Sequence, residues 1–383
     1  MVLTDSEAGR QSLANGTAGT ALLHIERALT GTGGWATAHR RIRRAANGPL
    51  DAGDHAGLYY GAPAIAFVLH CAHPRYQPAA IGLDRHLLRL AQRRLATANT
   101  RIDRGQTATF GEYDLFYGLT GLAALLLRHQ PDSDTLADLL RYLIRLTRPH
   151  RADGIELPGW WVAHHPDPSL PTPGGHANLG MAHGAAGLLA LLSLATRHGR
   201  VVDGQTEAID ALCDWFDRWR QDSDDGSWWP QWLTRDDLRT GRPSQRGPGR
   251  PSWCYGAVGI ARALQLAAIA THHHRRRATA EDTLAACLTG RQLRRITDTG
   301  LCHGIAGIYQ TAYRAARDAR TPTIGQQLPA LAETLSRHAA ATEDDPTNDA
   351  GLLTGSAGAR LTLETASHTT PPRSGWDACL LIT

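Results

Sequence analysis

Apolar residues along the chain gather into helical runs, and seven of these runs follow the same short motif. The motif is a glycine, two small or apolar residues, a second glycine or an alanine, and then the apolar run. Consecutive copies lie 45 to 72 residues apart. A repeat at such a period predicts that each copy is one supersecondary unit of a larger array. The first glycines of the copies are Gly16, Gly61, Gly118, Gly184, Gly256, Gly304 and Gly355.

Each interval has room for a second, amphipathic helix after the one that follows the motif. Residues Leu136–Thr147 and Thr206–Trp219 show the spacing of apolar positions typical of such a helix. The sequence therefore predicts seven helical hairpins, in which the glycines permit close backbone approach. An open α-solenoid is one arrangement of such hairpins. Seven apolar inner helices at unequal intervals favour a closed double ring instead. We expect an all-α fold, and we see no β-hairpin signal.

The repeat also decides the expected number of domains. A length of 383 residues alone suggests two or three domains. Hairpins that run from one end of the chain to the other predict a single domain, residues 1–383, with one site at one end of the barrel.

Two long intervals contain segments rich in proline, glycine and tryptophan, at residues 153–182 and 221–253. This composition predicts irregular loops rather than helices. The first segment leads into His183 and the second into Cys254. Trp228, Trp229 and Trp232 fit either a peptide-binding groove or packing that anchors the loop.

Composition excludes several classes of protein. The net charge of +4 is too balanced to indicate a nucleic-acid partner. All 40 basic residues are arginine, which excludes mechanisms that need a catalytic lysine. The chain has no apolar stretch of about 18 residues, so no integral membrane segment is expected. Its start does not resemble a signal peptide. We therefore expect a cytoplasmic protein, in which cysteines stay reduced.

Two copies of the motif carry residues that can bind a metal ion. Cys254 precedes Gly256, and Cys302 and His303 precede Gly304. Because these are equivalent places in separate repeats, we expect the three side chains at the same end of the barrel. Two thiolates and one imidazole form a ligand set typical of catalytic zinc, which keeps a fourth position open. The other cysteines fit buried packing positions: Cys71, Cys213, Cys287 and Cys379.

These motifs together resemble the lanthionine synthetase C family, the lanthipeptide cyclases. The resemblance runs from about residue 12 to the end of the chain, and the pair of motifs around Cys254 and Cys302 is its most specific part. It implies an α/α toroid with one Zn²⁺ per chain, held by Cys254, Cys302 and His303. The motifs that carry it are Ser12-Leu-Ala-Asn15-Gly16, Tyr113-Asp114-Leu-Phe-Tyr-Gly118, Ala182-His183-Gly184, Trp253-Cys254-Tyr255-Gly256, Cys302-His303-Gly304 and Trp376-Asp377-Ala378-Cys379-Leu-Leu.

The resemblance also implies catalytic roles for four residues. His183 corresponds to the acid/base histidine of the family, and Asp114 to its neighbouring aspartate. Arg250 and Tyr255 correspond to groups that could stabilise an enolate. Without the resemblance, an N-terminal cap or helix-dipole partner would be the preferred interpretation of Asp114 at the start of a helix.

The implied reaction adds cysteine thiols of a precursor peptide to dehydroalanine or dehydrobutyrine, a Michael addition that closes thioether rings. The expected partners are this dehydrated peptide, a separate dehydratase and a transporter, with membrane association only through partner proteins. One alternative is an enzyme that adds glutathione or another free thiol to dehydroamino acids. Another is a non-catalytic scaffold of a peptide-maturation complex.

Overall fold

The computed structural model describes residues 9–167, 169–341, 351–368 and 370–383, and most of its regular structure is α-helical. These residues divide into two compact units. One comprises Met1–Leu90 with Ile296–Thr383, and the other comprises Ala91–Arg295. The first boundary lies inside helix α5 (Gln77–Asp103), so one continuous helix contributes to both units.

The seven motif glycines each stand directly before a helix, as the repeat predicts. Six of them have an extended backbone, whereas Gly61 has a φ of +75°, in the region that favours glycine. The helices that follow are largely buried and correspond to the predicted apolar runs. They are α2 (Thr17–Thr30), α4 (Ala62–Cys71), α7 (Leu119–His129), α9 (Ala185–Arg197), α12 (Ala257–Ala270), α15 (Ile305–Asp318) and α17 (Ser356–Ser367).

The second glycine of the motif allows the first turn of the helix to lie on the residues that precede it. A Cβ atom at Gly259 would come within 2.0 Å of the Trp253 carbonyl oxygen. A Cβ atom at Gly187 would come within 2.5 Å of the Met181 carbonyl oxygen. Any side chain would therefore push the turn before the helix away from the helix itself.

A second helix follows six of the seven inner helices among the described residues. The predicted segments Leu136–Thr147 and Thr206–Trp219 lie within two of these outer helices and are confirmed. After α17, the chain instead forms the 3-10 segment η2 (Trp376–Leu380). The outer helices are α3 (Trp35–Ala45), α5, α8 (Asp134–Thr147), α10 (Gln205–Trp219), α13 (His274–Cys287) and α16 (Leu328–Ala341).

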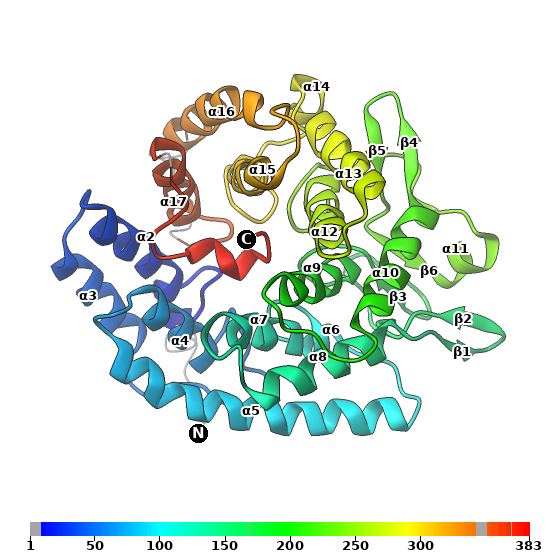
Figure 1. Ribbon diagram of the computed structural model, residues 1–383, viewed down its shortest axis with the longest axis horizontal. Helices are drawn as coiled ribbons and strands as arrows, with labels where there is room; N and C mark the ends of the chain where they lie inside the picture. Colours follow the sequence, from blue (N-terminus) through cyan, green and yellow to red (C-terminus); the bar gives the residue numbers. More distant parts are fainter. Residues whose placement is uncertain (1–8, 168, 342–350, 369) are drawn as a thin grey trace. The chain divides into compact units, whose positions relative to one another are not determined.

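Inner helices pack against one another within each unit. In the unit of residues 91–295, α12 lies between α9 and α13, and α9 also contacts α7 and α10 (Figure 1). In the other unit, α2 contacts α3 and α17, and α15 contacts α16 and α17. The core of each unit is made of aliphatic side chains from these helices.

The expectation that no β-hairpin is present was wrong. Strands β1 (His150–Ala152) and β2 (Ile155–Leu157) form an antiparallel hairpin, as do β4 (Gln221–Ser223) and β5 (Gly226–Trp228). The first turn is Asp153-Gly154, with φ values of +52° and +76°, a dipeptide that favours this type of turn. The strands have three residues each, too few to show an alternating pattern in the sequence.

The two long segments are also joined to each other. Strand β3 (His176–Asn178) pairs antiparallel with β6 (Trp232–Thr234), so that Ala177 lies opposite Leu233. The short helix α11 (Arg235–Thr240) follows β6 at once and begins with a capping box of Thr234 and Asp237. The segments that lead into His183 and Cys254 therefore share one small sheet.

Candidate active site

His183 and Asp114 form the hydrogen-bonded pair that the sequence analysis singled out. His183 Nδ1 lies 2.6 Å from Asp114 Oδ2. The Asp114 side chain is fully buried, whereas that of His183 is 19% exposed. Since Nδ1 donates to a carboxylate, Nε2 is the ring nitrogen that can exchange a proton with a substrate.

Asp114 also stabilises the turn that precedes α7. Its Oδ1 accepts hydrogen bonds from the backbone amides of Tyr117 and Gly118, at 2.7 and 2.8 Å. Gly118 is the N-cap of α7 and Tyr117 precedes it, so these amides belong to the turn that leads into the helix. One carboxylate oxygen of Asp114 thus holds the turn before α7, and the other contacts His183.

Aromatic rings fix the plane of the His183 imidazole. Phe110, at the start of the short helix α6 (Phe110–Tyr113), stacks on it with ring centroids 4.9 Å apart. Phe116 meets it edge-on at 4.8 Å. Tyr255 lies 6.1 Å away at a tilt of 36°. The hydroxyl group of Tyr113 donates to the His183 carbonyl oxygen at 2.9 Å, which holds the backbone as well.

The turn that carries Cys254 and Tyr255 packs directly on the segment before His183. The amide of Met181 donates to the Cys254 carbonyl oxygen at 2.8 Å. A Cβ atom at Gly180 would lie 2.3 Å from that oxygen and 2.9 Å from Cδ1 of Tyr255. Only glycine permits this approach, which brings Tyr255 and the largely buried Cys254 next to the chain that presents His183.

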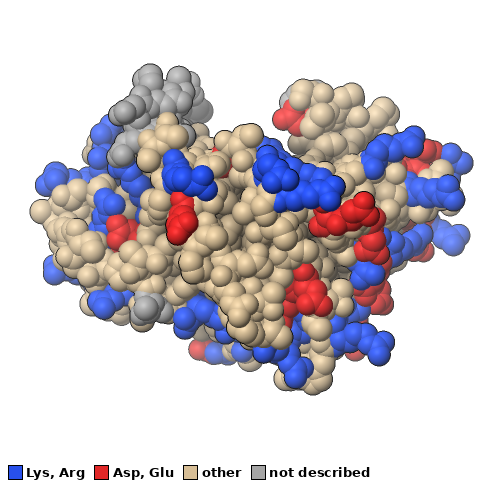
Figure 2. All heavy atoms as spheres, turned by 90° about the horizontal axis from the view of Figure 1, so that it is seen from above, with Lys and Arg blue, Asp and Glu red and all other residues tan. Residues whose placement is uncertain are grey.

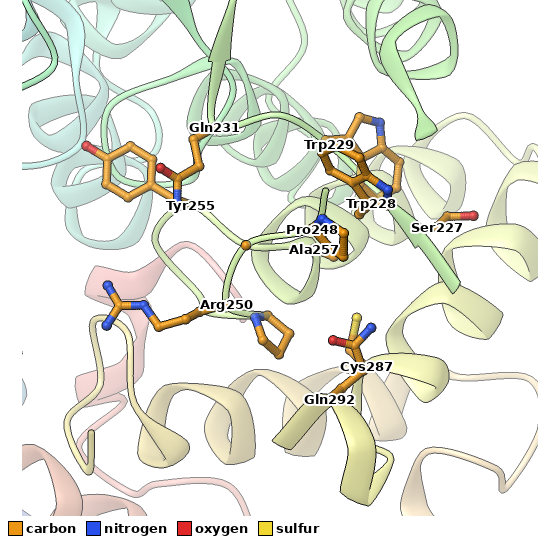
Figure 3. A pocket seen from close by; sticks show the side chains of 13 residues that line it. Ser227, Trp228, Trp229, Gln231, Pro248, Arg250, Tyr255, Ala257, Cys287 and Gln292 are labelled. Atoms are coloured by element: carbon orange, nitrogen blue, oxygen red, sulfur yellow. The ribbon is translucent and has the colours of Figure 1, made fainter. Parts of the chain in front are cut away.

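Arg250 and Tyr255 line the same small cavity, which is also lined by Trp228 and Trp229 of the second long segment (Figure 3). In that view, the Arg250 guanidinium and the Tyr255 ring extend to the same side, away from Cys287 and Gln292. Trp229 is buried, and its Nε1 donates to the Phe216 carbonyl oxygen at 2.7 Å. This contact supports the packing interpretation for Trp229.

Cys302 and His303 belong to the other unit, and their own surroundings are well defined. The Cys302 amide donates to the Leu353 carbonyl oxygen at 2.8 Å. His303 Nε2 lies 2.8 Å from Asp298 Oδ2. A histidine paired with a carboxylate in this way is the usual arrangement of a metal-ligating imidazole, because the carboxylate fixes the ring and raises its basicity.

Sequence reasoning missed several residues around His183 and its stacking partner Phe110. Phe110, His164 and His176 lie outside the quoted motifs, whereas Phe116 lies within the motif Tyr113-Asp114-Leu-Phe-Tyr-Gly118 but was given no role. The density of histidines in the segment before His183 was the available signal. By contrast, the four cysteines assigned to packing positions are all buried, as expected.

Charge on the surface is mixed. On the face drawn in Figure 2, basic and acidic side chains lie interspersed, without a broad region of one sign. Several arginines pair with carboxylates, such as Arg101 with Glu112 and Arg295 with Asp225. Among the described residues, no helix combines the length and the apolar character needed to cross a bilayer.

Comparison with known proteins places this geometry in a family. The family model described as "Lanthionine synthetase C-like protein" matches residues 7–381. The chain belongs to the lanthionine synthetase C-like family. This match confirms the resemblance on which the sequence analysis relied.

Within this lanthionine synthetase C-like family, one similar relative is the nisin biosynthesis protein NisC of Lactococcus lactis subsp. lactis. It is 23% identical to the chain over 263 residues, which are 66% of the chain and 60% of that protein. The solved structure of a nisin cyclase matches with a TM-score of 0.82 at 20% identity, and covers 98% of the chain and 92% of its own. This likeness shows the expected fold class, the α/α toroid.

Proposed function

We propose that the protein is a zinc-dependent lanthipeptide cyclase. The observation that carries the proposal is the pair of His183 with the buried Asp114. This pair lies beside Tyr255, on the turn that also carries Cys254. Family membership and the relative named for nisin biosynthesis support a role in peptide cyclisation. The chain aligns with only 60% of that relative's length, so activity, substrate and partners are all part of the proposal.

The proposed zinc ligands are Cys254, Cys302 and His303. Thiolate and imidazole donors favour the binding of zinc, whereas magnesium and calcium favour oxygen ligands. The pairing of His303 with Asp298 fits a ligating imidazole. A bound zinc ion would lower the pKa of a substrate thiol, which is otherwise mostly protonated at neutral pH.

The proposed reaction adds a cysteine S–H of the substrate across the Cα=Cβ bond of a dehydroamino acid. A carbon–sulfur bond forms at Cβ, and the electron pair of the double bond moves to Cα and the adjacent carbonyl oxygen as an enolate. Protonation at Cα then completes the thioether. No atom is gained or lost, so the peptide mass stays constant while one thiol disappears.

His183 is assigned the protonation of Cα. Its Nδ1 is engaged by Asp114, and Nε2 therefore delivers the proton. Asp114 holds the tautomer and stabilises the imidazolium. Arg250 and Tyr255, which line one cavity, are assigned the stabilisation of the enolate oxygen.

The partners follow from this chemistry. The substrate is a precursor peptide whose serine or threonine residues are already dehydrated, which requires a separate dehydratase. A transporter would export the product. Because the substrate cysteine must be a free thiol, we place the enzyme in the cytoplasm, with any membrane association through partner proteins.

The direct test is incubation of the purified protein with a dehydrated peptide that contains one cysteine. We expect the peptide to lose its reactivity toward a thiol-alkylating reagent without a change in mass. His183→Ala should slow this loss by a factor of about 10² to 10⁴. Glutathione added to a cysteine-free dehydrated peptide tests the free-thiol alternative: a glutathione adduct formed faster than ring closure would contradict the cyclase proposal. An unchanged rate in His183→Ala would contradict the role of His183.

A further inference from the structure

The ring of Phe110 stacks on the plane of the His183 imidazole. The two rings are nearly parallel, at 20°, with centroids 4.9 Å apart. The Phe110 ring is also edge-on to His164 and His176, at 4.6 and 5.4 Å. Three histidines therefore surround one phenylalanine, and only His183 is assigned a catalytic role.

The position of Phe110 depends on its backbone. Phe110 is the first residue of α6, so its amide has no acceptor within the helix. The Nε2 atom of His164 accepts a hydrogen bond from this amide at 3.3 Å. The N-cap of α6 is Thr109, whose side chain accepts from the Glu112 amide, and an imidazole from the segment before His183 accepts from the first amide of the same helix.

The other contacts of His164 determine which of its nitrogens can accept. Its Nδ1 lies 2.8 Å from the His165 carbonyl oxygen, an acceptor only, so Nδ1 must carry a proton. The Nε2 lone pair is then directed to the Phe110 amide. The backbone of His164 is itself held, because Nδ1 of the fully buried His176 donates to the His164 carbonyl oxygen at 3.0 Å.

These contacts point to His164 as a positioning residue, and this inference rests on the proposed function of His183. We propose that His164 holds the Phe110 amide so that the Phe110 ring stacks on His183 and fixes the direction of His183 Nε2. His164 has no contact with His183 in the described hydrogen bonds and ring pairs, so it acts through Phe110. A misplacement of about 1 Å in a catalytic group can lower a rate by roughly a hundredfold.

Three single variants separate this role from general stability. His164→Phe removes the acceptor and keeps a ring of similar size. His164→Gln keeps a side-chain acceptor near the place of Nε2. His165→Phe is the matched control, because the neighbouring His165 ring accepts from the Thr172 amide and has no contact with Phe110.

The first readout does not require enzymatic activity. The ring current of a stacked phenylalanine shifts the His183 Hε1 proton signal, which the spectrum of His183→Ala assigns by its absence. We expect this signal to move in His164→Phe, in the same direction as in Phe110→Leu, and to stay in place in His164→Gln and His165→Phe. An unmoved signal in His164→Phe would overturn the inference whether or not the protein is a cyclase.

The second readout is ring closure on the dehydrated peptide. We expect His164→Phe to lower kcat about tenfold with little change in KM, and His164→Gln to restore most of it. An equal loss in His164→Phe and His165→Phe would show a general effect on the segment and overturn the inference. If His164→Phe does not fold, Phe110→Leu is the remaining test. A Phe110→Leu protein with neither a moved His183 Hε1 signal nor a lowered kcat overturns the inference.

Discussion

Asp114 and His183 stand 69 residues apart in sequence, and Asp114 Oδ2 accepts a hydrogen bond from His183 Nδ1 at 2.6 Å. The other carboxylate oxygen accepts from the amides of Tyr117 and Gly118. The carboxylate is fully buried and held at both oxygens. It therefore cannot rotate without breaking its hydrogen bonds to the amides of Tyr117 and Gly118 before α7. The His183 imidazole, to which we assign a catalytic role, is therefore oriented by a group that is itself held by the turn before α7.

Replacing Asp114 by asparagine separates its two tasks. An amide oxygen can still accept from Tyr117 and Gly118, but the amide NH₂ then faces His183 Nδ1 and favours the wrong tautomer. We expect kcat for ring closure to fall by roughly 10² to 10⁴, as for carboxylates that orient a catalytic histidine elsewhere. Steady-state kinetics and a thermal melt measure the two effects.

A matched control for this variant is Ser133→Ala, which removes the cap of α8, where Ser133 Oγ accepts from the Leu136 amide. It should cost about 1 kcal/mol of stability and leave kcat unchanged. If Asp114→Asn lost no more activity than Ser133→Ala, Asp114 would be a cap alone.

Metal content tests the ligand assignment. Elemental analysis should give about one zinc per chain in the wild type, and Cys302→Ala should lose most of it. Asp298→Asn should bind zinc roughly 10- to 100-fold more weakly in competition with a chelator, because it loosens the His303 ring. Cys213→Ala is the control: burial raises the pKa of this thiol to about 12, so it stays protonated and should not contribute. A wild type that retains no zinc in zinc-supplemented buffer would refute the mechanism.

Asp377 anchors η2 to α15 through a buried ion pair. Its carboxylate accepts from Arg314 Nε and Nη2 at 2.6 and 2.7 Å, and from Gln310 at 2.6 Å. Asp377→Ala leaves a largely buried guanidinium without its partner and should cost about 3–5 kcal/mol of unfolding free energy in urea. Asp138→Ala, which removes an exposed pair with Arg141, should cost at most about 1 kcal/mol.

The same urea titration addresses the number of domains. Because α5 runs through the boundary of the two compact units, we propose that residues 1–383 form a single domain and unfold in one transition. Two transitions, of which Asp377→Ala shifts only one, would contradict that proposal.

The burial of His176 should lower the free energy of unfolding at acidic pH. Burial lowers its pKa from 6.5 to about 4, so the folded protein keeps it neutral where the unfolded chain would bind a proton. Its contribution to stability is complete above pH 6.5 and is lost as the pH falls toward 4, by at most about 3 kcal/mol. Urea unfolding of the wild type and of His176→Asn at pH 7 and pH 4.5 measures this difference. A variant with the same pH dependence as the wild type would contradict the assignment to His176.

The repeat made the first residue of each inner helix predictable. Each inner helix begins directly after a motif glycine, since close packing at that point leaves a choice of only one residue type. The two outer helices that the sequence analysis delimited were also found, because their apolar residues recur at helical spacing.

The surroundings of the site were less predictable for a physical reason. The pairing of β3 with β6 and the contact of His164 with Phe110 join residues more than fifty positions apart. Neither contact leaves a periodic pattern in the sequence. A strand of three residues is too short to show one, and a single hydrogen bond to one histidine involves only two positions. The Asp114–His183 bond was within reach only because a family resemblance named both residues.

The pairing of β3 with β6 makes the two long segments a single exchangeable module. Strand β3 leads toward His183, and β6 leads toward Cys254. A change in the length of one segment alone would therefore shift the pairing register of β3 with β6, which positions both segments. Chimeras between members of the family should therefore exchange both segments together. The first would include the whole β1–β2 hairpin (residues 150–182), and the second would end before Trp253 (residues 221–252). Homologues that lengthen one of these segments should show a compensating change in the other.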